Sequence, residues 1–256
     1  MHLDVQQLSK VFTTRRGPLL VLDQVSLYIN SGEFVCVLGA SGSGKTTLLR
    51  IIAGLETPTH GQVTVDGHAV SGPGSDRGLV FQTYTLYPWL TVQDNIEFGL
   101  KLQGMPKGER RDRVHHYLHI VGLGRYAQLF PHQLSGGMKQ RVAIARALVT
   151  EPQVLLMDEP FGALDAQTKE MMHEFLLDLW RRTRTTILMI THDVEEAVFL
   201  AQRIYVLTSS PGRVKEEVAI QLPLERTYRC KRQLEFVQQR ETILDLLREE
   251  RLKAIA

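Results

Sequence analysis

The segment Gly39–Thr46, with the sequence GASGSGKT, constrains the fold of this chain more than any other feature. It matches the pattern G-x-x-x-x-G-K-[ST], in which glycines let backbone amides curl around a phosphate without Cβ clashes. The apolar run SGEFVCVLG precedes it and predicts a buried strand, and TTLLRIIAG follows it and predicts an amphipathic helix that ends at Gly54. The sequence therefore predicts a strand, a phosphate-binding loop and a helix whose N-terminus points at the anion.

Each residue type in this loop has a chemical reason to be there. Gly42 and Gly44 free the backbone, Lys45 offers a positive charge to the outer phosphates, and Thr46 offers a hydroxyl to Mg²⁺. The alternative is a glycine-rich turn that binds nothing, and the flanking strand and helix patterns argue against it. The candidate phosphate-binding residues are Gly39, Ala40, Ser41, Gly42, Ser43, Gly44, Lys45, Thr46 and Thr47.

A second apolar run, VLLMDEP at 154–160, ends in two acids. A buried strand delivers its last residues to the carboxyl edge of the sheet, where ligands bind in open α/β folds. We expect Asp158 to hold Mg²⁺, directly or through water, and Glu159 to act as general base on a water beyond the γ-phosphate. Neighbouring residues on a strand point to opposite sides, so the two acids should differ in role. A polar strand end without function is the alternative, and only the phosphate loop makes the pair informative.

The segment LSGGMKQRVAIARAL at 134–148 predicts another helix with small residues at its start. Ser135 suits the N-cap, and Gly136 and Gly137 leave backbone amides accessible, so this helix end is a candidate second anion site. An ordinary capped helix is an equally simple interpretation of the spacing alone. One nucleotide hardly needs two such helix ends from one domain, which first suggests that two chains share each nucleotide.

The order of the remaining patterns predicts an α/β fold in one domain spanning residues 1–256. Strand patterns dominate the first 80 residues, with LDVQQLSKVF and LLVLDQVSLYI flanking a polar loop and GQVTVDGHAV and RGLVFQ following. Helical periodicity takes over in the stretch of about 83–148, and strands and helices alternate again after it. RIYVLTSSPGRV predicts a final strand that turns on its Pro-Gly, and residues of about 228–256 predict an amphipathic helical tail.

Composition limits the classes of partner. Of 256 residues, 43% are hydrophobic and 23% charged, and the formal net charge of +2 is too small for a nucleic-acid footprint. Cys36 and Cys230 are too few for a disulfide framework and indicate a reducing compartment. Neither a signal core nor an apolar run of about 18 residues is evident, so we expect a cytosolic protein that reaches membranes through a partner.

These motifs together resemble those of the ABC (ATP-binding cassette) ATPases over essentially the whole chain. GASGSGKT resembles their Walker A motif, VLLMDE their Walker B motif plus catalytic glutamate, and LSGGMKQ their signature sequence. Gln82 in VFQ resembles the Q-loop, Asp165 in GALD the D-loop, and His192 in ITHD the switch histidine. The signature's usual fifth residue is Gln, and Met138 replaces it here.

The resemblance implies a P-loop NTPase with a mainly parallel core sheet, an N-terminal antiparallel β subdomain and an inserted α-helical subdomain. It also implies a dimer in which each ATP lies between one phosphate loop and the other chain's Ser135–Gly136–Gly137. Mg²⁺ would be bound by Thr46, Gln82 and Asp158, and His192 would contact the γ-phosphate and orient Glu159. Phe12 matches the position where the family stacks an aromatic ring, more often Tyr, on adenine; a strand core residue is the alternative.

The same family comparison suggests an importer. QTYTLYPWLTVQDNI is similar to the surface that receives the membrane subunit, and GPGSDRGLVFQ, LYPWLTVQDNI and SSPGRV resemble the nitrate/sulfonate/taurine branch. The implied function is an ATPase subunit at the cytoplasmic face of a membrane, energising uptake of a small anion or zwitterion. Its implied partners are a second copy, permease subunits meeting the Gln82–Asn95 region and, indirectly, an extracytoplasmic substrate-binding protein.

Three other functions remain open at this point. They are an ABC ATPase of another importer or exporter class, a soluble ABC ATPase acting on nucleic acid or ribosomes, and a P-loop kinase or GTPase, which would not explain LSGGMKQ. His115 and His119 share a helix face and could bind a metal, and the basic run at 226–233 could meet lipid headgroups, but a solvated surface explains both.

Overall fold

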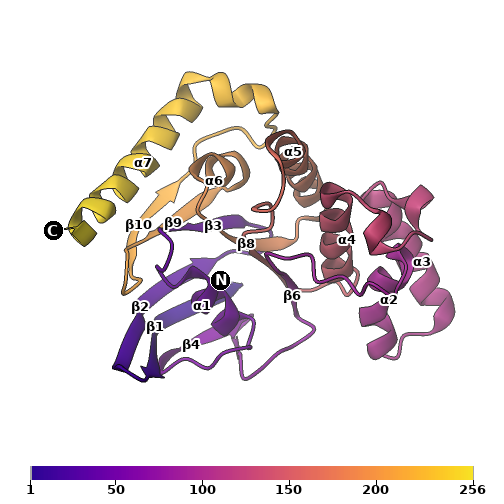
Figure 1. Ribbon diagram of the computed structural model, residues 1–256, viewed down its shortest axis with the longest axis horizontal. Helices are drawn as coiled ribbons and strands as arrows, with labels where there is room; N and C mark the ends of the chain where they lie inside the picture. Colours follow the sequence, from indigo (N-terminus) through magenta and orange to yellow (C-terminus); the bar gives the residue numbers. More distant parts are fainter. Residues whose placement is uncertain (1, 256) are drawn as a thin grey trace. The chain divides into compact units, whose positions relative to one another are not determined.

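The computed structural model describes residues 2–255, with only the backbone described at residues 251 and 253–255 (Figure 1). The described chain divides into two compact units. The first unit comprises Met1–Gly74 and Arg184–Ala256, and the second comprises Ser75–Thr183. The predicted phosphate loop and His192 belong to the first unit, whereas the acid pair and the signature segment belong to the second.

The first unit contains an antiparallel sheet with strand order β2-β1-β4-β5. Its strands are β1 (Leu3–Thr14), β2 (Gly17–Ile29), β4 (His60–Val65) and β5 (His68–Ala69). β1 and β2 form a long hairpin, in which buried residues flank a half-buried one in Leu3–Val5 and an exposed one in the paired segment Leu27–Ile29. This alternation is what a sheet covered on one face requires. The predicted N-terminal antiparallel β subdomain is therefore present.

The first unit also contains four strands in the order β10-β9-β3-β8. They are β3 (Phe34–Leu38), β8 (Thr186–Thr191), β9 (Arg203–Leu207) and β10 (Val214–Ala219). β3 runs parallel to both β8 and β9, and every residue of these three strands is buried. Continuous apolar runs of this kind are typical of parallel strands covered on both faces. Helix α6 (Val194–Leu200) contacts β3 and β8, and α1 (Lys45–Ile52) contacts β8 and β2.

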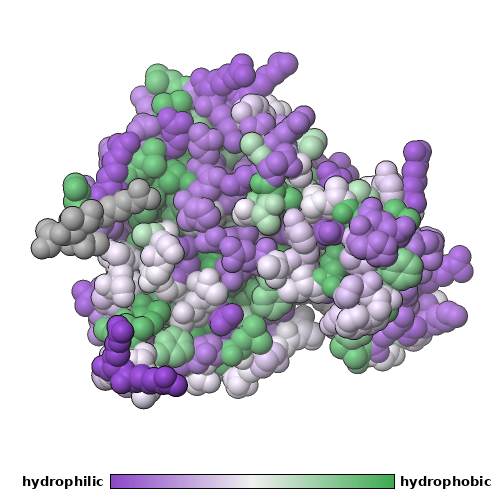
Figure 2. All heavy atoms as spheres, in the orientation of Figure 1, coloured by the Kyte–Doolittle hydropathy of each residue, from purple (hydrophilic) through white to green (hydrophobic). Residues whose placement is uncertain are grey.

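Two details of the C-terminal region differ from the sequence-based expectation. The predicted final strand is a hairpin, because β9 and β10 are antiparallel partners on either side of the Pro211–Gly212 turn. The tail begins with a 3-10 turn at Tyr228–Arg232, and helix α7 (Leu234–Ile255) starts after it. Phe236 and Ile243 are buried as the amphipathic pattern predicted, and Ala256 lies outside the described residues. Figure 2 shows mostly hydrophilic side chains along α7, with isolated hydrophobic ones between them.

The second unit combines one parallel strand pair with the predicted helical insertion. β6 (Arg77–Val80) pairs in parallel with β7 (Val154–Asp158). The helices are α2 (Val92–Leu102), α3 (Lys107–Ile120), α4 (Gly136–Leu148) and α5 (Ala166–Thr183), with 3-10 turns at Gly124–Tyr126 and Pro131–Gln133. α2 packs mainly against α4, and α4 also contacts β6 and α5. Trp180 of α5 is buried.

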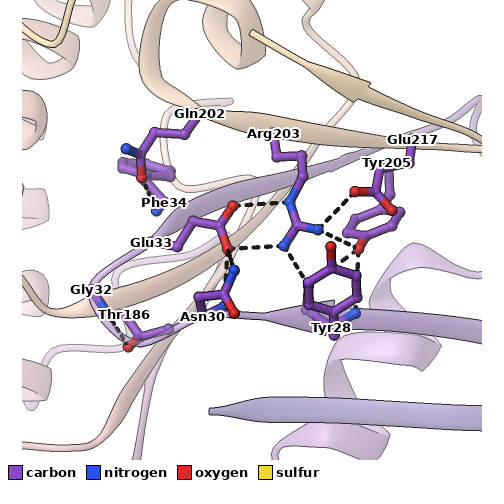
Figure 3. A network of polar contacts seen from close by, with 10 residues as sticks. All are labelled: Tyr28, Asn30, Gly32, Glu33, Phe34, Thr186, Gln202, Arg203, Tyr205 and Glu217. Carbon is purple, nitrogen blue, oxygen red and sulfur yellow. Dashed lines mark hydrogen bonds and ion pairs between the residues drawn. The ribbon is translucent and has the colours of Figure 1, made fainter. Parts of the chain in front are cut away.

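One buried cation joins four segments of the first unit (Figure 3). The Arg203 side chain is only 9% exposed and forms two 2.9 Å hydrogen bonds with the Glu33 carboxylate. It also donates to Glu217 at 2.7 Å and to the Tyr28 carbonyl at 2.8 Å, while its guanidinium lies 4.1 Å from the Tyr28 ring centroid. Burial raises the pKa of the neighbouring Tyr205 to about 12, so this phenol stays protonated and donates to the Tyr28 carbonyl. The cluster ties β2, β9, β10 and the turn before β3 together.

Replacing this arginine should therefore be costly. We expect Arg203→Met to lower the free energy of unfolding by about 3–5 kcal/mol, because two carboxylates lose their shared buried cation. Urea denaturation measures the loss. Arg213→Met is the matched control: Arg213 pairs with Asp23 but its side chain is 62% exposed, so its loss should stay within about 1 kcal/mol. Equal losses for the two variants would contradict the structural importance of the cluster.

Candidate nucleotide-binding site

The loop between β3 and α1 has the backbone that wrapping an anion requires. Gly42 and Gly44 have φ angles of 82° and 84°, in the left-handed region that favours glycine. A Cβ at Gly44 would lie 2.6 Å from Leu22 Cδ2, so the loop also needs glycine there for close approach. Lys45 is buried, and its ammonium donates to the carbonyls of Gly39 and Ala40 at 2.9 Å each. The lysine charge is thus held inside the curve of the loop.

The residues of this loop fit a phosphate group. A Cβ at Gly42 would meet nothing within 4 Å, so the outer side of the loop is open. Thr46 is exposed on the first turn of α1, where the helix N-terminus is positive and a hydroxyl can reach a metal-bound phosphate. The Ser43 hydroxyl is buried, and no hydrogen-bond partner is found for it within the described residues. A glycine-rich loop with a buried lysine charge and an exposed hydroxyl suits a magnesium–nucleotide phosphate.

His192 leaves the same sheet edge as the phosphate loop. In the parallel pairing of β3 with β8, Leu38 is the partner of Thr191, so the residue after each strand emerges at the same level. His192 is exposed, and Asp193 after it caps α6 by accepting a hydrogen bond from the Glu196 amide at 3.2 Å. The structure therefore brings the phosphate loop and His192 to one carboxyl edge within the first unit.

The acid pair and Gln82 converge in the same way within the second unit. Val80 of β6 is the partner of Met157 in β7, so both strands end at one edge. β7 ends at Asp158, and Glu159 follows in the left-handed region at φ 42° rather than on the strand, so a turn sets its direction. The Gly162 amide donates to the Glu159 carbonyl at 3.2 Å, and a Cβ at Gly162 would lie 4.0 Å from Gln82 Nε2. Gln82 thus lies beside the turn that carries the glutamate.

The signature segment is held by close contacts at its glycines. Ser135 caps α4 as predicted, accepting a hydrogen bond from the Met138 amide at 3.3 Å. A Cβ at Gly136 would lie 3.0 Å from both Tyr84 Oη and Leu164 Cδ2. A Cβ at Gly137 would lie 2.9 Å from Thr168 Cγ2. The N-terminus of α4 therefore lies against both the segment after Gln82 and the GALD segment.

Arg146, which was not among the predicted site residues, ties α4 to the segment after Gln82. Its guanidinium donates to the Thr85 carbonyl at 2.8 Å and to the Thr85 hydroxyl at 2.9 Å, and it lies 5.5 Å from the Tyr87 ring centroid. Burial lowers the pKa of Arg146. A single arginine inside the apolar stretch AIARAL was the available signal, because a charge on a buried helix face needs fixed partners.

Phe12 lies on β1 opposite Leu19 of β2 and is partly exposed. The Lys10 ammonium lies 4.7 Å from the centroid of its ring. This arrangement covers one part of the ring with a cation, and the partial exposure suits an aromatic platform better than a strand core residue. The adenine-stacking role of Phe12 stays a prediction.

A metal site at His115 and His119 gains no support from the geometry. The residues that the structure describes contain no group of three or more His, Cys, Asp or Glu side chains placed to hold a metal, so His115 and His119 lack a third ligand. Among the same residues, no helix combines the length and apolar character that crossing a membrane requires. Cys36 is fully buried, and burial, followed by the charge of Glu196, raises the pKa of its thiol well above the usual value. Cys36 is therefore an inert core residue.

A glycine-rich phosphate loop on a parallel sheet, with an acid pair and a second glycine-led helix, defines a P-loop nucleotide-binding protein. The family model described as "ABC transporter" matches residues 22–162, and the chain belongs to this family. It is 58% identical to the nitrate import ATP-binding protein NrtD of Synechocystis, over 97% of this chain and 96% of that protein. It is 51% identical to the taurine import ATP-binding protein TauB of Burkholderia pseudomallei, over 83% of this chain and 82% of that one. These relatives confirm the predicted branch.

A solved structure confirms the fold class. A dimeric ATP-binding cassette in a post-hydrolysis state, bound to ADP and Pi, is 35% identical and aligns with a TM-score of 0.74. The alignment covers 86% of this chain and the whole of that cassette. The α/β P-loop architecture of the ABC ATPases is therefore the fold of this chain.

The carboxylate of Asp165 leads to a prediction about how the stability of the fold depends on pH. It accepts a hydrogen bond from the Thr168 amide at 3.0 Å at the start of α5, and hydrogen bonds from Thr168 lower its pKa. A lowered folded-state pKa means that the ionised cap stabilises the fold above the unfolded-state pKa of about 3.9 and loses this contribution as pH falls through the folded value.

We therefore expect Asp165→Ala to lower the urea midpoint at pH 7, and the gap to the wild type to narrow towards pH 3. Asp165→Asn should keep most of the cap, because an amide oxygen also accepts from the helix amides. A gap that stays constant between pH 7 and pH 3 would rule out the ionised cap.

Proposed function

We propose that this chain, as a single ABC ATPase domain over residues 1–256, binds and hydrolyses ATP to energise a membrane importer. The observation that carries the proposal is the ordered set of residues at the strand ends. The phosphate loop and His192 follow the C-terminal ends of β3 and β8, which pair in parallel. Gln82, Asp158 and Glu159 lie at or just after the C-terminal ends of β6 and β7, which also pair in parallel. The sequence relatives and the ADP-bound cassette support the same activity.

The proposed reaction is hydrolysis of the γ-phosphoryl group. Lys45 and the loop amides bind the phosphates, and Glu159 accepts a proton from the attacking water. The water oxygen forms a bond to the γ-phosphorus while the bond from that phosphorus to the bridging oxygen breaks, which yields ADP and phosphate. His192 orients the γ-phosphate and Glu159. Phe12 stacks on the adenine, and Ser41, Ser43 and Thr47 complete the lining of the phosphate loop.

Thr46, Asp158 and Gln82 are the residues proposed to hold Mg²⁺. The ion would neutralise charge that develops on the phosphate oxygens. Hydroxyl, carboxylate and amide oxygens are the hard donors that this cation prefers, so the donor set fits. Asp158 would bind it directly or through water.

We further propose that two copies form the working unit, with each ATP contacted by the other copy's Ser135, Gly136 and Gly137. The N-terminus of α4, capped by Ser135, is the positive end of the helix and suits phosphate oxygens. The solved cassette that resembles this chain is described as dimeric, which supports the arrangement. Asp165, between β7 and α5, would lie near the same dimer contact.

The general base provides the direct test of the chemistry. We expect Glu159→Gln to lower ATP turnover by a factor of about 10²–10⁴, because the amide cannot accept the proton of the water. Phosphate release measures turnover, and ATP-dependent dimerisation by gel filtration should persist or increase. Glu109→Gln, on the exposed face of α3, is the matched control and should leave turnover unchanged. Wild-type turnover in Glu159→Gln would refute the assignment.

The permease contact is proposed for the region Gln82–Asn95. Trp89 is 71% exposed there, and the Tyr87 ring lies 5.6 Å from Trp89 and 4.6 Å from Phe98 between ring centroids. An exposed aromatic on a supported cluster is typical of an interface anchor. This placement would put the protein peripherally at the cytoplasmic face of the membrane, with an extracytoplasmic binding protein as an indirect partner.

Removing the Trp89 ring should weaken binding to the permease without changing ATP hydrolysis. We expect Trp89→Ala to reduce recovery of the permease subunit by at least about tenfold, because interface anchors contribute 2 kcal/mol or more. Basal ATP turnover without the permease should remain within twofold. Leu102→Ala removes another exposed apolar side chain (76% exposed) outside the region and should leave recovery unchanged. Equal recovery in the two variants would move the contact elsewhere.

The relatives named for nitrate and taurine import support a small anion or zwitterion as the transported substrate. Purification of the protein from detergent-solubilised membranes, with its cognate binding protein then screened against nitrate, taurine and sulfonates, tests this substrate class. Recovery of an integral membrane subunit supports the importer. Recovery of ribosomes or nucleic acid instead would favour the soluble ABC ATPase class and overturn the transport function.

A further inference from the structure

The turn that carries His192 is enclosed by hydrogen bonds from the residues on either side of it. Thr191, at the end of β8, is 1% exposed, and its hydroxyl donates to the carboxylate of Glu196. The same hydroxyl accepts a hydrogen bond from the Asp193 amide at 3.0 Å. Asp193 in turn accepts from the Glu196 amide at 3.2 Å. Thr191 and Glu196 therefore link the end of the strand to the start of α6, with His192 between them.

Helix α6 is itself fixed at its C-terminal end by the C-terminal region of the chain. Arg226 is buried, and its guanidinium donates to the carbonyls of Val198, Phe199 and Ala201 at 3.1, 2.9 and 2.9 Å. These are carbonyls that a helix end leaves without intrahelical partners. A buried cation with several carbonyl acceptors holds α6 in one place along its axis.

The first turn of α6 is also tied to the C-terminal region. Glu195 pairs with Arg240 of α7 at 3.2 Å and with Lys231 at 3.6 Å. These pairs are partly exposed and individually weak, but they act at the end of α6 that lies next to His192. Both ends of the seven-residue helix are thus attached to residues 226–240.

We propose that Thr191 and Glu196 are positioning residues for ATP hydrolysis. They hold the turn that carries His192 in the position from which the His192 ring reaches the γ-phosphate. The inference rests on the proposed function of His192. The register of β3 and β8 fixes where the backbone leaves the sheet, but it does not fix the direction in which the exposed His192 side chain points. The hydroxyl of Thr191 supplies that direction, because it bonds to both the backbone and the side chain that flank the histidine.

This role differs from a stabilising role in what it predicts. A residue that only stabilises the fold would lower the melting temperature, and any change in activity would be the same whether His192 is present or absent. A residue that acts through His192 lowers the rate of hydrolysis only while the histidine is there. The two roles are therefore separable by combining substitutions.

The decisive experiment compares Thr191→Val with Thr191→Ser in the full-length protein. Valine keeps the size of threonine but lacks the hydroxyl, whereas serine keeps it. We expect Thr191→Val to lower kcat for ATP by about tenfold, as small misplacements of catalytic groups do, with KM and nucleotide affinity within twofold. Thr191→Ser should restore kcat to within twofold of the wild type.

Thr186→Val is the matched control, since Thr186 is buried at the opposite end of the same strand and its hydroxyl accepts from the Gly32 amide at 3.0 Å (Figure 3). It should cost stability but leave kcat within twofold of the wild type. Glu196→Met, compared with Glu196→Gln, is the second test and decides the question where Thr191→Val does not fold. Because the amide oxygen introduced by Glu196→Gln can still accept from the Thr191 hydroxyl, this variant should keep kcat within about threefold of the wild type. Glu196→Met, which lacks an acceptor, should lower kcat in the same direction as Thr191→Val.

The double variant Thr191→Val/His192→Ala tests whether Thr191 acts through His192. We expect it to hydrolyse ATP at the rate of His192→Ala alone. A further tenfold loss, or a parallel loss of affinity and rate in Thr191→Val, would overturn the positioning role. Wild-type turnover in His192→Ala would instead refute the proposed function of the histidine. A full loss in His192→Ala with no loss in Thr191→Val would refute this inference alone.

Discussion

The in-register pairing of β3 with β8 is the constraint on which the rest of the first unit depends. Because Leu38 and Thr191 are partners, the phosphate loop and the turn of His192 leave the sheet at one level, and a slip of one residue would turn every side chain of one strand to the opposite face. Both faces of these strands are buried, so the close packing of their side chains maintains this register. The second unit repeats the principle with β6 and β7, whose ends carry Gln82 and the acid pair.

Much of this could be predicted from the sequence, because the strongest signals were local. The apolar strand runs, the left-handed glycines of the phosphate loop and the N-cap Ser135 each follow from the preferences of a few neighbouring residues. The hairpin of β9 with β10 was not predicted, because the sequence of a Pro-Gly turn does not show whether it interrupts one strand or connects two strands. The bend at Glu159 was also missed, since a left-handed conformation at a glutamate has no sequence signal.

The contacts that hold the site residues were beyond sequence reasoning for a different reason. Arg146 reaches Thr85 across 61 positions, and Arg226 reaches the end of α6 across 25 to 28 positions, so only the folded chain shows these pairs. The pattern D-x-x-E at Asp193 and Glu196 was a readable helix-start signal. Its capping bond was therefore predictable, whereas the bond of Glu196 to Thr191 was not.

Both units support their exposed catalytic candidates in the same physical way. His192 and Gln82 are exposed, and the segments that bear them are held by arginines that donate hydrogen bonds to main-chain carbonyls. Arg226 does this at the end of α6, and Arg146 does it at Thr85. A backbone carbonyl accepts a hydrogen bond whatever the side chain of its residue. These bonds therefore fix the backbone of the exposed segment without constraining its amino-acid sequence. Arg226 and Arg146 thus fix the backbone of the segments that carry these exposed side chains.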